Sequence, residues 1–321
     1  MSECSSVSGI GPENIATISR RAVLDFFHQT EISMQRRRWC YDSSGQVEQR
    51  FLQGLSEWHE LDFMADKYKK AHYTSVCVAT TMFGHTHLDT QVFIALYSLL
   101  AGCVDDLEID DIALEEFAPR INSGAPQLHP ILDLLVQHLR RARDYYPAYS
   151  STAIFAGTIQ FVNATWFDRR CGTNIGMPLQ KDALPYVRFK RARNSLGEVY
   201  NLFAWDKFNF PDVTRHIQIL PVYLDYANDI LSFYKEECAG EKDNFVHDRA
   251  VVTGKPLSAV LSDMLEELVK SVKQARVIIQ DERARSTWEE FIEGYVAFHL
   301  LSPRYRLEEL LGPKFISELD I

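Results

Sequence analysis

Apolar residues recur at helical spacing along most of the chain. The first clear stripe follows Ile18 and contains four residues at positions i, i+1, i+4 and i+5: Ala22, Val23, Phe26 and Phe27. Such a stripe is typical of the buried face of an amphipathic helix. Comparable patterns predict further helices over residues 51–68, 73–83, 90–104, 131–146, 153–170, 217–237, 257–280 and 286–300. Because no alternating run is long enough to predict a strand, we expect an all-α fold of about ten or more helices.

The segment from residue 90 to residue 104 is apolar on nearly all sides, which predicts a helix in the interior of the protein. Its longest apolar run, residues 92–104, is shorter than the roughly 20 residues that a membrane-spanning helix needs. We therefore expect a buried helix and no membrane span.

An acidic block directly follows this apolar segment. Five of the seven residues from Asp105 to Asp111 carry carboxylates. Carboxylates at the C-terminal end of a helix oppose its macrodipole and repel one another. The block is therefore either a solvated acidic loop or a divalent-metal site, in which a bound cation would offset the repulsion.

A second oxygen-rich group lies within the helix predicted over residues 217–237. Asn228, Ser232 and Glu236 are spaced i, i+4 and i+8, which places their side chains on one face of a helix. Amide, hydroxyl and carboxylate oxygens are ligands of Mg²⁺, and phosphate oxygens of a substrate would complete such a site. The alternative is a helix end whose polar residues cap the helix or face water.

Cationic residues accompany the two oxygen-rich groups. Arg191 lies between them, Lys235 lies inside the second group, and Arg304 follows with Tyr305 beside it. Arginine and lysine neutralise phosphate oxygens that metal ions also bind. Nearby aromatic side chains suit an apolar chain and attract a carbocation through its charge. The combination indicates a metal-bridged diphosphate site.

Composition narrows the functional classes. The 321 residues, of which 46% are hydrophobic, can support a large core, and we expect a flexible tail over residues 1–15 and a single helical domain over residues 16–321. A net charge of −10 argues against nucleic acid as a general partner. Six scattered cysteines indicate reduced thiols in a cytoplasmic protein. Residues 1–12 lack the apolar segment of a signal peptide.

The stretch from Asn228 to Glu236, Asn-Asp-Ile-Leu-Ser-Phe-Tyr-Lys-Glu, matches the N-D-x-x-S-x-x-x-E metal motif of class I terpene cyclases and resembles the fungal trichodiene synthase family in particular. Residues 191–197, 294–300 and 304–307 resemble segments of the same family. The resemblance extends from about residue 90 to about residue 312. It implies a class I terpene synthase bundle of helices around a central active-site cavity.

The resemblance also implies an activity and a set of ligands. The expected enzyme is a lyase that cyclises farnesyl diphosphate and releases diphosphate, through a bisabolyl cation as in the formation of trichodiene or cuprenene. Three Mg²⁺ ions would bind with the diphosphate. A homodimer is a further expectation about partners. The implied metal ligands are Asp105, Asn228, Ser232 and Glu236.

Further roles follow from the same resemblance. The residues implied to donate hydrogen bonds to the diphosphate are Arg191, Lys235, Arg304 and Tyr305. Asp106 would pair with Arg304 when the site closes, and Ser195 stands where the family usually has a small effector residue. The candidates for the lining of the cavity are Tyr295, Phe298, Trp166 and Phe167.

The acidic motif departs from the family pattern D-D-x-x-D, because residue 109 is Ile and the next acids are Asp110 and Asp111. Either of these two could complete the motif. Two other functions stay open. A prenyl-chain elongase would need a second aspartate-rich motif where residues 228–236 lie, and a non-catalytic binding protein on the same fold would be expected to have lost a metal ligand.

Overall fold

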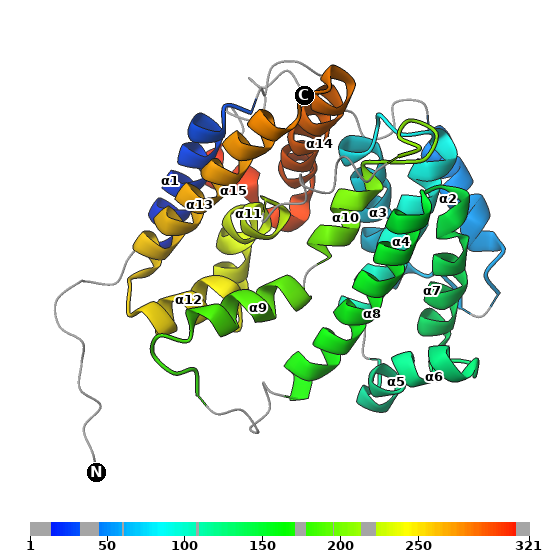
Figure 1. Cartoon of the computed structure of the whole chain (residues 1–321). Coiled ribbons are helices and arrows are strands. Elements are labelled where there is room, and N and C mark those ends of the chain that lie inside the picture. Colours follow the sequence, from blue (N-terminus) through cyan, green and yellow to red (C-terminus); the bar gives the residue numbers. More distant parts are fainter. Residues whose placement is uncertain are drawn as a thin grey trace, which may run out of the picture.

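The computed structural model describes residues 14–32, 45–59, 61–106, 109–170, 178–194, 196–212 and 223–312. In these ranges all regular structure is helical, as the sequence predicts (Figure 1). The α-helices are α1 (Ile15–Thr30), α2 (Gln46–Ser56), α3 (Lys69–Met82), α4 (Leu88–Asp106), α5 (Asp111–Glu115), α6 (Phe117–Ser123), α7 (Pro130–Arg140), α8 (Ala148–Arg170), α9 (Leu184–Asn194), α10 (Gly197–Phe203), α11 (Tyr223–Ala239), α12 (Phe245–Thr253), α13 (Leu257–Ile278), α14 (Glu282–Leu301) and α15 (Leu307–Leu311). Three 3₁₀ helices join them: η1 (Asp66–Tyr68), η2 (Arg141–Asp144) and η6 (Pro303–Tyr305).

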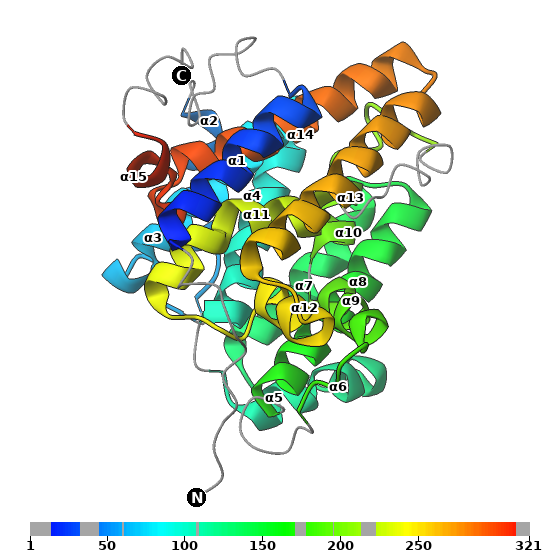
Figure 2. The ribbon, with the colours of Figure 1, turned by 90° about the vertical axis from the view of Figure 1, so that its left-hand side faces the viewer.

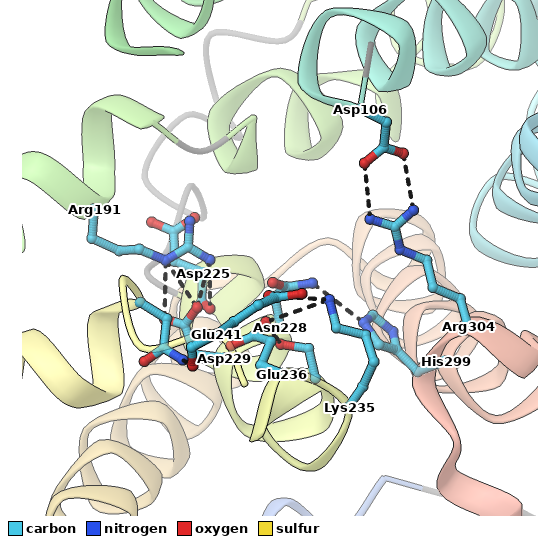
Figure 3. A network of polar contacts seen from close by, with 12 residues as sticks. Asp106, Arg191, Asp225, Asn228, Asp229, Lys235, Glu236, Glu241, His299 and Arg304 are labelled. Carbon is cyan, nitrogen blue, oxygen red and sulfur yellow. Dashed lines mark hydrogen bonds and ion pairs between the residues drawn. The ribbon is translucent and has the colours of Figure 1, made fainter. Parts of the chain in front are cut away.

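The helices form two groups that share one hydrophobic core (Figures 1 and 2). In the first group, α2, α3 and α7 pack around α4. In the second, α1 and α13 pack against α11. Helix α14 joins the groups, because it packs against α3 and against η6, which in turn contacts α11. Helix α10 joins them as well, through contacts with α11 and with α8, which packs against α4. As a result, the C-terminal end of α4 and one face of α11 lie in the same part of the molecule (Figure 3).

The central helix α4 is buried along most of its length. Twelve of its 19 residues are buried, as expected for a helix that is apolar on nearly all sides. Among the described residues, α4 alone has the length and apolar composition that a membrane span requires. Its packing against α2, α3 and α7 identifies it as a core helix of the protein and not a span.

Gly294 allows α14 to cross α3 at very short distance. A Cβ atom at this position would lie 2.1 Å from the carbonyl oxygen of Thr81 and 2.9 Å from the Cα atom of Met82. Such distances are far inside van der Waals contact with backbone atoms, which cannot move aside as a flexible side chain can. The glycine therefore determines how closely α14 approaches the core, and α14 leads directly into the segment that carries Arg304.

The prediction of one continuous helix over residues 51–68 is wrong. Helix α2 ends at Ser56, and the chain becomes helical again only at Asp66–Tyr68. The intervening loop is anchored by aromatic side chains, with the Trp58 and Phe63 rings 5.5 Å apart. Phe51, Leu55 and Trp58 are spaced i, i+4 and i+7, so the hydrophobic pattern of α2 continues into the loop and imitates a longer helix.

The short helices α5, α6 and α12 were not expected from the sequence, because helices of 5, 7 and 9 residues contain too few turns for a periodic signal. Residues 1–13 of the expected tail and residues 217–222 of the expected long helix lie outside the described residues.

At the start of α1, the side chain of Asn14 accepts a hydrogen bond from the backbone nitrogen of Thr17, 3.1 Å away. This is a common N-terminal cap.

We expect Gly294→Ala to lower the free energy of unfolding by about 3 kcal/mol or more, because the added methyl group overlaps backbone atoms of α3. Thermal unfolding followed by circular dichroism measures the effect. The matched control is Gly102→Ala in α4, where a Cβ atom would meet nothing within 4 Å and the better helix former should leave stability unchanged or raise it by up to about 1 kcal/mol. Equal melting temperatures for the two variants would contradict the close crossing.

Candidate active site

One face of α11 carries the three predicted metal ligands. Asn228, Ser232 and Glu236 lie in successive turns of this helix. The Ser232 hydroxyl donates a hydrogen bond to Oε1 of Glu236 at 2.6 Å, so these two oxygens already converge. Ser232 is buried, and the Glu236 side chain is only 14% exposed. One amide, one hydroxyl and one carboxylate form an all-oxygen donor set that fits Mg²⁺.

His299 of α14 contacts Asn228, and Tyr295 precedes it by one turn on the same helix. Nε2 of His299 lies 3.5 Å from Nδ2 of Asn228, and Nδ1 of the same ring lies 2.9 Å from the carbonyl oxygen of Tyr295. The Tyr295 hydroxyl donates to the carbonyl oxygen of Leu224 at 3.1 Å. His299 is fully buried, and burial lowers its pKa to about 3, so its ring is neutral.

Arg304 spans the gap between η6 and the end of α4 (Figure 3). Its Nη1 and Nη2 atoms donate to the two carboxylate oxygens of Asp106 at 3.1 and 3.5 Å. The structure thus contains the pair that the sequence resemblance implied. Both side chains are about half exposed, at 45% and 55%, so the pair contributes little to stability. Its geometric effect is to tie the segment after α14 to α4.

Asp105 belongs to the same acidic end of α4 and faces the cations. The side chain is solvent-accessible, yet loss of part of its hydration raises its pKa, and Asp106 raises it further. The positive charges of Arg304, Lys235 and Arg169 oppose this effect. Three cations from three different elements are therefore within electrostatic reach of one carboxylate.

Arg169 binds two backbone carbonyl groups next to the carboxylates of the acidic block. From the last turn of α8 it donates to the carbonyl oxygen of Ile109 at 2.7 Å and to that of Val104 at 3.3 Å. The Val104 carbonyl is among the last four of α4, which have no partner within the helix. A guanidinium at this end also favours the macrodipole that the carboxylates oppose. Nothing in the sequence pattern links residue 169 to this block, so the sequence does not predict this contact.

Arg191 is anchored to α11 immediately beside the ligand face. Its Nε atom lies 3.0 Å from both carboxylate oxygens of Asp229, and its Nη2 atom lies 3.1 Å from the carbonyl oxygen of Asp225. The side chains of the ion pair are only 14% and 11% exposed. Burial acts to lower the pKa of Arg191, but the carboxylates of Asp229 and Asp225 outweigh it and raise the pKa. The guanidinium thus stays charged next to Asn228.

Lys235 and Tyr305 complete the group of predicted diphosphate contacts. The Lys235 ammonium lies 3.7 Å from Glu241 and 3.9 Å from Glu236. Tyr305 is buried, with its ring centroid 4.1 Å from that of His299, and burial raises the pKa of its hydroxyl. The negative charge of Glu236 raises that pKa as well, and η6, which contains Tyr305, contacts α11.

The expected lining residues differ in their surroundings. Tyr295 and Phe298 are buried, at 7% and 5% exposure. Trp166 is half-buried, whereas Phe167 is 41% exposed, so the expectation that Phe167 lines a dry interior is not supported. Ser195 lies outside the described residues, between the end of α9 and the start of α10. Its role as the effector residue stays a prediction.

Comparison with known proteins gives matches over most of the chain. The trichodiene synthase (TRI5) family model matches residues 34–319. Terpene synthase 29 of Postia placenta is 32% identical over 306 residues, which are 93% of this chain and 86% of the relative. Monoterpene synthase 25 of the same organism is 35% identical over 249 residues, 76% of this chain and 74% of the relative. Alpha-cuprenene synthase COP6 of Coprinopsis cinerea is 27% identical over 241 residues, 73% of each chain.

We expect Arg169→Met to weaken binding of Mg²⁺ in the presence of diphosphate several-fold and to lower the melting temperature. The variant leaves the carbonyl groups of Val104 and Ile109 without their donor, so the carboxylates next to them lose their fixed positions. Isothermal titration calorimetry measures the first effect and circular dichroism the second. The control is Arg170→Met, because this exposed neighbour lies over the Trp166 ring, 6.0 Å from its centroid. Identical Mg²⁺ affinities for the two variants would show that Arg169 does not organise the acidic block.

Proposed function

The chain belongs to the trichodiene synthase family, whose model matches residues 34–319, and we propose that it is a sesquiterpene synthase that cyclises farnesyl diphosphate with Mg²⁺. As a family member it is a terpene synthase, a lyase that acts on a diphosphate. The observation that best supports the proposed site is the pairing of Asp106 with Arg304 opposite the ligand face of α11. Acidic, oxygen-donating and cationic groups from separate helices meet there, as binding of a metal-bound diphosphate requires.

The proposed metal ligands are Asp105 on α4 and Asn228, Ser232 and Glu236 on α11. All four offer oxygen atoms, and together they carry two negative charges. Mg²⁺ keeps several positions for water or phosphate oxygens, so a diphosphate would supply the remaining ligands and charge. Three ions bound with the diphosphate are the expected stoichiometry for this family.

In the proposed reaction, the bond between the allylic carbon and the diphosphate oxygen breaks, and its electron pair leaves with the diphosphate. Bound Mg²⁺ would stabilise the anion that departs. Arg191, Lys235 and Arg304 would donate further hydrogen bonds to its oxygens. Asp229 already holds Arg191 beside α11, so this donor needs little reorganisation as charge develops.

The Asp106–Arg304 pair would act as the closing contact. A cation formed in the site must be shielded from water, or it would be quenched. The pair joins the end of α4 to the segment after α14, opposite the α11 residues that would bind the metal (Figure 3). Because both side chains are about half exposed, the pair is weak enough to open for product release.

The proposed route passes through a bisabolyl cation to a product of the cuprenene or trichodiene type. The support is the resemblance of residues 228–236, 294–300 and 304–307 to that family and a relative named alpha-cuprenene synthase. Tyr295 and Phe298 are the proposed aromatic contacts of the cation. Loss of a proton from the last cation gives the neutral hydrocarbon and balances the charge.

A shorter substrate, geranyl diphosphate, is the second candidate. It is favoured by one relative, named monoterpene synthase, which is 35% identical to this chain over 249 residues. Both substrates carry the same allylic diphosphate, so the proposed metal and cation contacts suit either one. The length of the apolar chain is what separates the two possibilities.

We expect purified protein to release a cyclic C15 hydrocarbon from farnesyl diphosphate, and all activity to stop with EDTA and return with excess Mg²⁺. Gas chromatography with mass spectrometry of the organic extract identifies the product, and geranyl diphosphate in a parallel reaction tests the second candidate. Longer prenyl diphosphates in a reaction supplied with isopentenyl diphosphate would indicate an elongase. No product from either substrate, or full activity in chelator, would refute the proposed function.

We expect Arg304→Lys to reduce turnover more than Tyr305→Phe. A lysine cannot reproduce the forked pair of bonds to Asp106, whereas the tyrosine variant loses one hydrogen bond to a charged acceptor, worth about 1.5–3 kcal/mol, and keeps its ring. Steady-state rates and product profiles of both variants provide the comparison. If Arg304→Lys matches the unmodified enzyme in rate and products, the bidentate role is wrong.

A further inference from the structure

We propose that His299 is a positioning residue that, together with Tyr295, turns the Asn228 side chain so that its oxygen faces the metal site. The inference rests on the proposed function, in which Asn228 is a Mg²⁺ ligand, and adds a residue outside the ligand set. An amide side chain has a carbonyl end that can bind Mg²⁺ and an NH₂ end that cannot. Something must therefore select between the two orientations of Asn228.

The hydrogen bonds of His299 determine which of its nitrogens carries the proton. Nδ1 lies 2.9 Å from the carbonyl oxygen of Tyr295, and a carbonyl oxygen can only accept, so Nδ1 donates. In the neutral ring Nε2 then has no hydrogen and can only accept. The atom of Asn228 that faces it, 3.5 Å away, is Nδ2, which is a donor.

The Tyr295 hydroxyl imposes the same orientation. It donates its hydrogen to the carbonyl oxygen of Leu224 at 3.1 Å. The Asn228 side chain is near enough to lower the pKa of this hydroxyl, and since the only hydrogen of Tyr295 is already used, its oxygen can act only as an acceptor towards Asn228. Two groups that can only accept, one turn apart on α14, are thus available to the NH₂ group of Asn228.

The reverse orientation would place the amide oxygen of Asn228 against two acceptors and direct its NH₂ group at the proposed Mg²⁺ site. Both changes are unfavourable, so the α14 side chains hold Oδ1 away from themselves and available to a metal. The His299 ring cannot easily turn to another partner, because the rings of Tyr295 and Tyr305 lie 4.5 and 4.1 Å from it. Its burial in this aromatic setting also disfavours a charged imidazolium.

The test compares two substitutions of His299. His299→Phe keeps a ring but removes the acceptor, and His299→Gln retains a terminal oxygen that can accept from Asn228. We expect the phenylalanine variant to lose about 10-fold or more in affinity for Mg²⁺ measured with inorganic diphosphate by isothermal titration calorimetry. The glutamine variant should recover most of that loss.

His138 provides a matched control. It is also a buried histidine, 3% exposed, and its Nε2 atom lies 2.9 Å from the carbonyl oxygen of Phe93, but it contacts none of the proposed ligands. His138→Phe should leave the Mg²⁺ affinity unchanged even if it lowers the melting temperature as much as His299→Phe does. If His299→Phe does not fold, Tyr295→Phe takes its place, because it removes the other acceptor, and it should weaken binding several-fold.

The outcomes separate this inference from the proposed function. If the unmodified protein binds Mg²⁺ with diphosphate and turns over substrate, but His299→Phe and His138→Phe bind Mg²⁺ equally well, the positioning role is overturned and the function stands. Equal losses in the phenylalanine and glutamine variants overturn it as well. If the unmodified protein binds no Mg²⁺ with diphosphate, both proposals fall.

Discussion

Repulsion among the carboxylates at the end of α4 is the constraint on which the geometry of the site depends. Asp105 and Asp106 end a buried helix whose macrodipole opposes them. Two arginines bind this end of α4 and offset the repulsion. Arg169 binds carbonyl oxygens behind the block, and Arg304 binds Asp106 in front of it. The acidic end is thereby held in place by contacts within the protein, which is the arrangement that electrostatic preorganisation requires.

Helix α14 connects this acidic end to the ligand face of α11. Gly294 permits its close approach to α3, and the following turns place Tyr295 and His299 against Asn228. The chain then turns through η6, where Arg304 reaches across to Asp106. Helix α14 therefore fixes the positions of the proposed metal ligands on α4 and α11 relative to one another. A small shift of α14 would disturb both sides of the site together.

The sequence predicted the helical class, the buried helix α4 and the placement of Asn228, Ser232 and Glu236 on one helix face, because each rests on local periodicity. It also predicted the Asp106–Arg304 pair, by resemblance to a family. It did not predict Arg169 or His299. Both act through contacts with residues 60 or more positions away, and no spacing rule connects such distant positions. The loop after Ser56 was mistaken for a helix because Trp58 continues the helical spacing of Phe51 and Leu55 beyond the end of α2.

The most direct test of this account is a crystal structure of the protein with Mg²⁺ and diphosphate bound. We expect one ion bound by Oδ1 of Asn228, Oγ of Ser232 and the carboxylate of Glu236 at about 2.1 Å, with Asp105 on a second ion and Arg304 on both Asp106 and the diphosphate. Nδ2 of Asn228 should still face His299. Ions bound away from α11, or an Asn228 amide turned with its nitrogen toward the metal, would contradict it.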